Sequence, residues 1–326
     1  MTAGKPREDI DFFPLVCDYR EKTESAGKIP GGFFKREGRP TTKEILTMRM
    51  IDRSIRPMFP DGYKAEVQVM THVLQYDGTN NPDVLAMIAA FAAIRVAGLP
   101  FDTSLGAVRI AHVDGEFVAF PTDEDRRSNS RLDLVVSGHK DGLAMVESSA
   151  KELSEAEMID ALEMASNTIQ DVVALVDEIK KVAGKPEIEH IAPTFDENLK
   201  AKVFEFENAL ASAIRVDGKH IRDDACNQVR KDCVEALTGG LEGDDLKAKT
   251  KEVKHFFHDL QQKVEREQIL SGNRVDGRAW DEIREITIVP DFIPRQHGSV
   301  LFTRGETQAL VSATLGTPDD EQIIDG

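Results

Sequence analysis

Residues 31–63 bring together the side chains whose types and spacing are best suited to chemistry. Two phenylalanines, Phe33 and Phe34, precede a series of seven cations: Lys35, Arg36, Arg39, Lys43, Arg49, Arg53 and Arg56. An arginine binds a phosphate group through two parallel hydrogen bonds, and an aromatic face stacks on an unpaired base. The stretch therefore predicts a stacking platform beside a cationic clamp, which suits single-stranded nucleic acid.

A second interpretation explains the same residues without a ligand. The phenylalanines would fill a core, and the cations would pair with nearby carboxylates, because basic clusters are often solvated faces. For Arg53 the candidate partners are Asp52 and Glu44. Local composition leaves both interpretations open.

The overall composition limits what the protein can be. The chain has 326 residues and a formal net charge of -17, so a polyanion must be bound by a local surface against the overall field. Hydrophobic residues make up 40% and charged residues 30%, as in a soluble protein of two or three domains. No apolar run approaches the roughly 20 residues of a membrane span, and no secretory signal opens the sequence. We expect a cytoplasmic protein without membrane contact.

The cysteine content points the same way. Cys17, Cys226 and Cys233 are odd in number and do not form a disulfide framework. Cys226 and Cys233 lie seven residues apart in a helical pattern, so we expect both to be small core residues.

Capping patterns predict the helices that must position the cations. Thr41 and Glu44 form a capping box, so Arg49, Arg53 and Arg56 are carried by one helix. Asn81 and Pro82 begin a second helix that is apolar almost all round and is expected to be buried. Two further capping boxes, Ser154 with Glu157 and Thr194 with Glu197, open later helices, the first of which runs to about Gly184.

Strands are predicted on both sides of a helical stretch. The stretch itself covers residues 195–272 and follows a linker rich in Gly and Pro. The predicted strands cover residues 11–19, 65–76, 106–113, 116–120, 132–139, 142–148 and 285–290, and a hairpin turns at Arg304-Gly305-Glu306.

Several long segments resemble one enzyme family in the same order. "DFFPL", "AGKIPGGFFKREGRP", "IDRSIRPMFPDGY", "NPDVLAMIAAFAA" and "LDLVVSGHKDGLAMVES" are similar to the first ribonuclease PH-like core of bacterial polynucleotide phosphorylases. "RVDGRAWDEIREI" and "PRQHGSVLFTRGETQALVSATLGT" resemble the opening of the second core of that family. The resemblance implies an α/β (α+β) architecture with three parts. These are a first core without its opening strands over residues 1–185, an all-helical domain over 186–272 and the start of a second core over 273–326.

The resemblance also implies a function. The family degrades single-stranded RNA from the 3′ end by phosphorolysis and releases nucleoside diphosphates, with Mg²⁺ as cofactor and inorganic phosphate as co-substrate. Its members form ring-shaped homotrimers, and we expect partnership with an RNA-degradation complex. In the family the metal and phosphate ligands lie late in the second core. We therefore assign no catalytic and no metal-binding residue and expect the isolated chain to be inactive; the alternative is a non-catalytic RNA-binding or assembly fragment.

The site residues follow from the family's basic loop, which lines the entrance to a central channel. Carried over to this sequence, the RNA-binding residues are Phe33, Phe34, Lys35, Arg36 and Arg39. The family commonly has an arginine where this chain has Lys35. A lysine cannot form the two parallel hydrogen bonds of a guanidinium group, which predicts weaker binding of phosphate at this position. The helix cations Arg49, Arg53 and Arg56 match family positions and either contact RNA or hold the helix by ion pairs. The pair His255 and His258 lacks a third ligand and is expected to be a feature of a helix surface.

Overall fold

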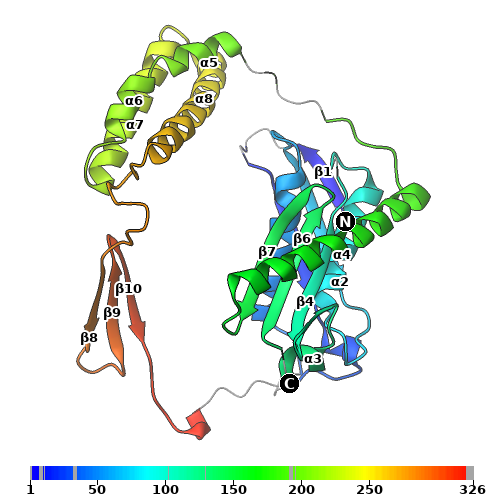
Figure 1. Cartoon of the computed structure of the whole chain (residues 1–326). Coiled ribbons are helices and arrows are strands. Elements are labelled where there is room, and N and C mark those ends of the chain that lie inside the picture. Colours follow the sequence, from blue (N-terminus) through cyan, green and yellow to red (C-terminus); the bar gives the residue numbers. More distant parts are fainter. Residues whose placement is uncertain are drawn as a thin grey trace. The chain divides into compact units, whose positions relative to one another are not determined.

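A computed structural model describes residues 2–6, 10, 12–31, 35–101, 103–128, 130–190, 194 and 196–320. The chain divides into two compact units, residues 1–193 and 194–324, which are described separately. Figure 1 shows the elements of each unit. In the part of the chain that the structure describes, no helix has the length and apolar character needed to cross a membrane.

The first unit is built from two sheets and a set of helices. The strands are β1 (Thr2–Pro6), β2 (Leu15–Arg20), β3 (Ala65–His72), β4 (Gly106–Val113), β5 (Glu116–Ala119), β6 (Leu132–His139) and β7 (Gly142–Ala150). The helices are α1 (Thr42–Ile55), α2 (Pro82–Ala97), α3 (Asp123–Ser128) and α4 (Glu155–Ala183), with short 3₁₀ turns at Thr23–Ala26 and Arg56–Met58.

The two sheets differ in topology. One has the order β1-β3-β2, with β1 antiparallel and β2 parallel to β3, and Leu15 lies opposite Val67. The other has the order β5-β4-β6-β7 and is antiparallel throughout. Because β2 and β3 are parallel neighbours, the chain between them has to cross over, and α1 lies in this connection.

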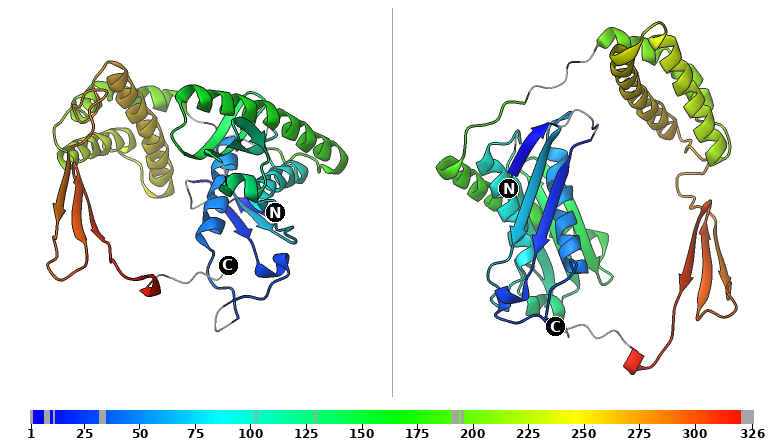
Figure 2. Two further views of the ribbon diagram at one scale, coloured as in Figure 1. Left: turned by 60° about the horizontal axis from the view of Figure 1, so that its bottom comes forward. Right: turned by 180° about the vertical axis from the view of Figure 1, so that it is seen from behind.

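Side chains on the second sheet alternate between two cores, which defines the layers. Ala107 and Val135 face the core shared by α1, α2 and the first sheet, whereas Val108 and Leu134 face α4. The first unit therefore consists of a sheet, a helical layer, a second sheet and α4, as the views from front and back show (Figures 1 and 2).

The second unit begins with helices and ends with a small sheet. The helices are α5 (Glu197–Phe204), α6 (Glu207–Ala213), α7 (Lys219–Thr238) and α8 (Gly243–Leu270), and the strands are β8 (Ile286–Pro290), β9 (Ser299–Arg304) and β10 (Thr307–Ser312), followed by a 3₁₀ turn at Pro318–Asp320. Cys233 is buried in the helical core and Cys226 packs against it, which confirms the prediction for both. The sheet has the order β10-β9-β8, and Gly305 adopts a φ of 58° at the hairpin turn.

The predicted helix starts are confirmed in three places and wrong in one. Thr41 and Ser154 each form a complete capping box, and Asn81 caps α2. The fourth start is Asp196 rather than Thr194: its carboxylate accepts hydrogen bonds from the N–H groups of Asn198 and Leu199. Asp and Thr are both good N-caps, so side-chain type alone did not separate the two positions.

Two other expectations needed correction. The predicted strand over residues 11–19 starts only at Leu15, and β1 was not predicted at all. Helix α2 is not buried all round, because Leu85 is 68% exposed and Ala89 and Ala93 lie exposed on the same stripe. The remaining predicted strands and the helical stretch after residue 195 are confirmed within the usual shift of a few residues.

Candidate nucleic-acid interface

The cationic segment 35–39 lies between the end of β2 and the start of α1. It has neither helical nor strand structure, and Lys35 adopts a left-handed φ of 49°. Lys35, Arg36 and Arg39 are exposed and have no hydrogen bond or ion pair with any residue that the structure describes. Phe33 and Phe34, the predicted stacking residues, lie outside the described residues. Three cations that have no partner among the described residues are thus presented together to solvent.

Glu37 fixes this segment to the end of β2. Its Oε1 accepts hydrogen bonds from the backbone N–H of Thr23 at 2.6 Å and from the Thr23 hydroxyl at 3.0 Å. Its other carboxylate oxygen lies 2.9 Å from the Lys22 ammonium. The Thr23 N–H, followed by Lys22, holds the pKa of Glu37 below its usual value. The single acid in the segment is therefore engaged elsewhere and does not neutralise the neighbouring cations.

Glu44 makes a second connection between the same two regions. Its carboxylate accepts the N–H of Thr41 at 2.6 Å and the N–H of Glu21 at 2.9 Å. Burial opposes ionisation of Glu44, but these hydrogen bonds outweigh it and lower its pKa. The N-terminus of α1 is thus held against the residue that follows β2, and Lys43 adds an ion pair to Glu21 at 2.7 Å.

The three arginines of α1 and its end have different surroundings. Arg49 is exposed and makes no ion pair or hydrogen bond within the described part of the chain. Arg53 pairs with Glu147 of β7 at 2.5 Å, and not with Asp52 or Glu44, so the predicted partners are wrong. Glu147 is 94 positions away in the sequence, and no local pattern identifies it.

Arg56 joins the end of α1 to the segment before β2. It binds both carboxylate oxygens of Asp52, at 2.8 and 2.5 Å, and donates to the carbonyl oxygens of Phe13 at 3.0 Å and Leu15 at 3.3 Å. Its guanidinium also lies 5.8 Å from the centre of the Phe13 ring. The hydrogen bonds to Asp52 raise its pKa despite partial burial. Arg56 is the cation of this set with the most contacts.

The predicted histidine pair does not form part of a metal site in the described structure. His258 Nε2 lies 3.0 Å from the side-chain nitrogen of Gln262. Among the described residues, no group of three or more His, Cys, Asp or Glu side chains is arranged to hold a metal ion.

Sequence reasoning missed the acids that organise the site. Sequence analysis treated Glu37 as one of many carboxylates. An acid between Arg36 and Arg39 would pair with these arginines unless another group binds it, and this was the local signal. It also missed a buried network in which Arg109 binds Asp83 at 2.7 Å and Asp133 at 2.8 Å. The signal for that network is an arginine within the apolar run of β4.

Comparison with known proteins agrees with this architecture. Residues 1–100 match the model of the 3′ exoribonuclease family, domain 1, and residues 103–168 match domain 2 of the same family. Residues 198–279 match the RNA-binding domain of polyribonucleotide nucleotidyltransferase. The fold is therefore that of the ribonuclease PH type with a helical domain, which confirms the predicted fold class.

Similarity to a curated relative identifies the family more closely than the domain matches do. Over 325 residues the chain is 44% identical to the polyribonucleotide nucleotidyltransferase of Rhodopirellula baltica, and the alignment covers 100% of this chain and 43% of the relative. The chain belongs to the polyribonucleotide nucleotidyltransferase family, as the resemblance predicted. It spans less than half the length of this relative.

Proposed function

We propose that this chain belongs to an enzyme that degrades single-stranded RNA from its 3′ end by phosphorolysis and releases nucleoside diphosphates. Within it, Lys35, Arg36 and Arg39 contact the RNA backbone. The observation that carries the proposal is the exposure of these three cations, which have no partner in the part of the chain that the structure describes, in a protein of net charge -17. Glu37, the acid between them in the sequence, binds Thr23 instead. The family membership supplies the reaction.

The proposed roles follow from the chemistry of each side chain. Arg36 and Arg39 suit bidentate contact with phosphate oxygens, and Lys35 adds a point charge. Phe33 and Phe34 are proposed to stack on bases, on the strength of the family resemblance. Arg49 extends the cationic surface along α1, whereas Arg53 and Arg56 are proposed to be structural because carboxylates already hold them.

Other parts of the proposal concern the whole protein. Mg²⁺ and inorganic phosphate are proposed as cofactor and co-substrate, but the described residues offer no cluster that fits a metal ion, so no step here depends on one. A homotrimer, an RNA-degradation complex and a cytoplasmic location are proposed on family grounds alone. The domain limits proposed are 1–185, 186–272 and 273–326.

The test compares RNA binding by the chain and by two triple variants of equal charge change. Lys35→Ala with Arg36→Ala and Arg39→Ala removes the proposed contacts; Lys140→Ala with Lys151→Ala and Lys181→Ala removes three exposed cations elsewhere in the first unit. Fluorescence anisotropy with a single-stranded RNA is recorded at several salt concentrations. For three lost phosphate contacts, the slope of log affinity against log salt should fall by about 2.

Two outcomes decide the proposal. Loss of affinity and slope in the first variant alone supports the RNA contact; equal losses in both variants, or none, overturn it. Phosphate-dependent release of nucleoside diphosphates by the full-length protein tests the reaction. RNA binding by that protein without such release favours the alternative, a non-catalytic RNA-binding or assembly role.

A further inference from the structure

Helix α8, in the helical part of the second unit, carries a second group of cations (Figure 1). Lys247, Lys251 and Lys254 are exposed, and their spacing of four and three positions places them on one face of the helix. We call these three residues the α8 stripe. With a rise of about 1.5 Å per residue, the stripe extends over roughly 10 Å along the helix axis.

The α8 stripe points away from the helical core. The side chains of Val253, Phe256, Phe257 and Leu260 are buried in that core. Because an α-helix has about 3.6 residues per turn, these four residues lie on the opposite side of α8 from the three lysines. The apolar face thus fixes the orientation of α8 and leaves the stripe open to solvent.

The one acid within residues 247–258 is bound elsewhere. Glu252 Oε1 accepts a hydrogen bond from the backbone N–H of Asp196 at 3.0 Å. Its other carboxylate oxygen lies 3.6 Å from the ammonium of Lys249, which is also 3.4 Å from the Asp196 carboxylate. Glu252 therefore joins α8 to the start of α5 and does not neutralise the α8 stripe.

The charges of the α8 stripe are available to a ligand. Lys251 and Lys254 have no hydrogen bond or ion pair with any residue that the structure describes. Lys247 pairs with Asp244 at 3.1 Å, but the two side chains are 81% and 98% exposed. A pair so exposed to water is weak, and a ligand can replace it at little cost.

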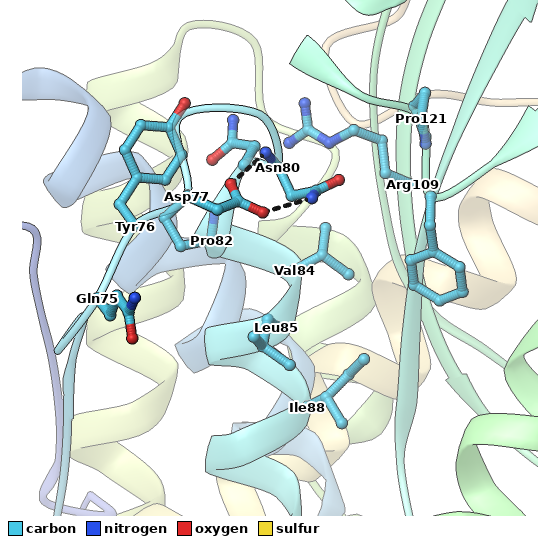
Figure 3. Close-up of a pocket in the computed structure, with 12 residues that line it drawn as sticks. Gln75, Tyr76, Asp77, Asn80, Pro82, Val84, Leu85, Ile88, Arg109 and Pro121 are labelled. Atoms are coloured by element: carbon cyan, nitrogen blue, oxygen red, sulfur yellow. Dashed lines mark hydrogen bonds between the residues drawn. The ribbon is translucent and has the colours of Figure 1, made fainter. Parts of the chain in front are cut away.

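A cation of the first unit shows the opposite situation. Figure 3 shows Arg109 at a pocket formed by the loop at residues 75–82 and the start of α2. Asp133 and Asp83 bind the two terminal nitrogens of its guanidinium, and the side chain is only 8% exposed. The charge of Arg109 is compensated inside the fold, so this cation cannot attract an anionic ligand as the α8 stripe can.

The position of the α8 stripe favours RNA as the ligand. In a protein of net charge -17, a polyanion is repelled by the overall field and needs a local group of cations. Helix α8 lies within residues 198–279, the part of the chain that matches the model of an RNA-binding domain. Lysine contacts phosphate as a point charge and carries no information about the base, so such a surface binds without regard to sequence.

We propose that the α8 stripe binds the phosphate backbone of single-stranded RNA, as a second contact in addition to residues 35–39. Its lysines are contact residues for RNA and take no part in the chemical step. The inference rests on the proposed function, because RNA is the polyanion that this function supplies. It depends on the second unit alone, whereas the first contact belongs to the first unit.

The test uses the 326-residue chain in which Lys35→Ala, Arg36→Ala and Arg39→Ala have removed the first contact. In this background, Lys251→Gln with Lys254→Gln neutralises two cations of the α8 stripe. Glutamine and lysine have similar helix propensities, so α8 is kept. Circular dichroism of each variant checks that the helix content is unchanged.

Two further variants separate the position of a charge from its mere presence. Lys202→Gln with Lys231→Gln removes the same charge from exposed positions of α5 and α7 and is the matched control. Lys251→Arg with Lys254→Arg keeps both charges on the α8 stripe. Fluorescence anisotropy with oligouridylate is recorded for all variants at several salt concentrations.

The glutamine variant of the α8 stripe should lose affinity, and its slope of log affinity against log salt should fall by about 1.4, since each lost contact with single-stranded RNA removes about 0.7. The matched control and the arginine variant should keep the slope. No RNA binding in the background chain, no loss in the glutamine variant, or an equal loss in the control would overturn the proposal. If polyglutamate of equal charge binds more tightly than oligouridylate and depends on the same two lysines, the ligand is an acidic protein segment and RNA is the wrong assignment.

The two RNA contacts can fail separately. If binding by the unaltered chain depends on Lys35, Arg36 and Arg39 and not on Lys251 and Lys254, the α8 stripe is rejected and the proposed function stands. If binding depends on Lys251 and Lys254 alone, the α8 stripe is supported and the contact at residues 35–39 is wrong.

Discussion

The Oε1 atom of Glu37 accepts two hydrogen bonds from Thr23, from its backbone N–H at 2.6 Å and from its hydroxyl at 3.0 Å. This contact removes the only carboxylate of residues 35–39 from the vicinity of the cations and fixes the segment at the end of β2. An acid thereby supports the cationic surface that is proposed to bind the RNA backbone.

Replacement of Glu37 should weaken RNA binding although it removes a negative charge. With Glu37→Ala the cations lose their fixed position, and the cost of ordering them on binding predicts an affinity about three- to tenfold lower. Glu24→Ala, which removes an exposed carboxylate one residue from Thr23, is the matched control. It should leave affinity unchanged or raise it. Anisotropy titrations check both; higher affinity in Glu37→Ala would contradict the positioning role.

The Glu37 contact should also depend on pH. Since folding lowers the pKa of Glu37 below its ordinary 4.5, the contribution of the contact is complete above that value. It is lost as the pH falls through the lower, folded-state pKa. The NMR shift of the Thr23 amide proton, followed from pH 7 to pH 2, should report the loss only below 4.5. In Glu37→Gln the same proton should not titrate over this range.

Arg56 should matter for stability rather than for RNA binding. Arg56→Lys keeps the charge but loses the fork that binds Asp52, Phe13 and Leu15 at once, which predicts a loss of about 1 kcal/mol. Arg49→Lys, at an exposed position without partners in the described structure, should stay within about 0.5 kcal/mol. Urea unfolding measures both. A larger effect of Arg56→Lys on RNA affinity than on unfolding would argue for direct contact.

The Arg109 network should show strong coupling. Arg109→Met leaves Asp83 buried without its partner and should cost about 3–5 kcal/mol. Asp83→Asn in the same chain should restore part of this loss, because an amide carries no buried charge. Burial raises the pKa of Asp83 even in the intact pair, so the cost of Arg109→Met should grow as the pH rises and Asp83 ionises. Additive losses in the double variant would rule out the coupling.

Gly98 should be needed to hold the segment that follows α4. A Cβ at Gly98 would overlap the carbonyl oxygen of Pro186, and the residue has a φ of 70°. Gly27, with a φ of 68° and no atom within 4 Å of such a Cβ, gives a control with equal backbone strain. Both alanine variants should lose about 1–2 kcal/mol from strain. Only Gly98→Ala should speed cleavage after Glu187 by a glutamate-specific protease, since Glu187 is exposed in this segment. Equal rates in the two variants would exclude the packing role.

The sequence predicted elements whose signals are local. The starts of α1, α2 and α4 were found because cap and first turn lie within four residues of each other. Strand β1 was missed because its sequence, TAGKP, has no apolar alternation, and its hydrogen bonds come from β3 more than 60 positions away. The helices could be predicted from local patterns, whereas β1 forms only because it pairs with a strand that is distant in the sequence.

The same distinction applies to the candidate interface. The cations at residues 35–39 were evident from composition. That they have no partner among the described residues depends on Glu37, which binds Thr23, 14 positions earlier. Ion pairs such as Arg53 with Glu147 join α1 to β7 and depend on the layers of the fold. The sequence pattern predicts a cationic surface, whereas long-range contacts decide which of its cations are held in ion pairs and which are not.

Two hydrogen bonds join the beginning of the crossover between β2 and β3 to the residues around the start of α1. The N–H of Thr23 donates to Glu37, and the N–H of Glu21 donates to Glu44. These two carboxylates mark off a loop whose ends are tied before the chain enters α1. The entropic cost of a loop grows slowly with length, about 0.6 kcal/mol for each doubling, so insertions between Thr23 and Glu37 should be tolerated. This part of the chain can therefore change in length and composition between relatives, or by design, while the folded body remains the same.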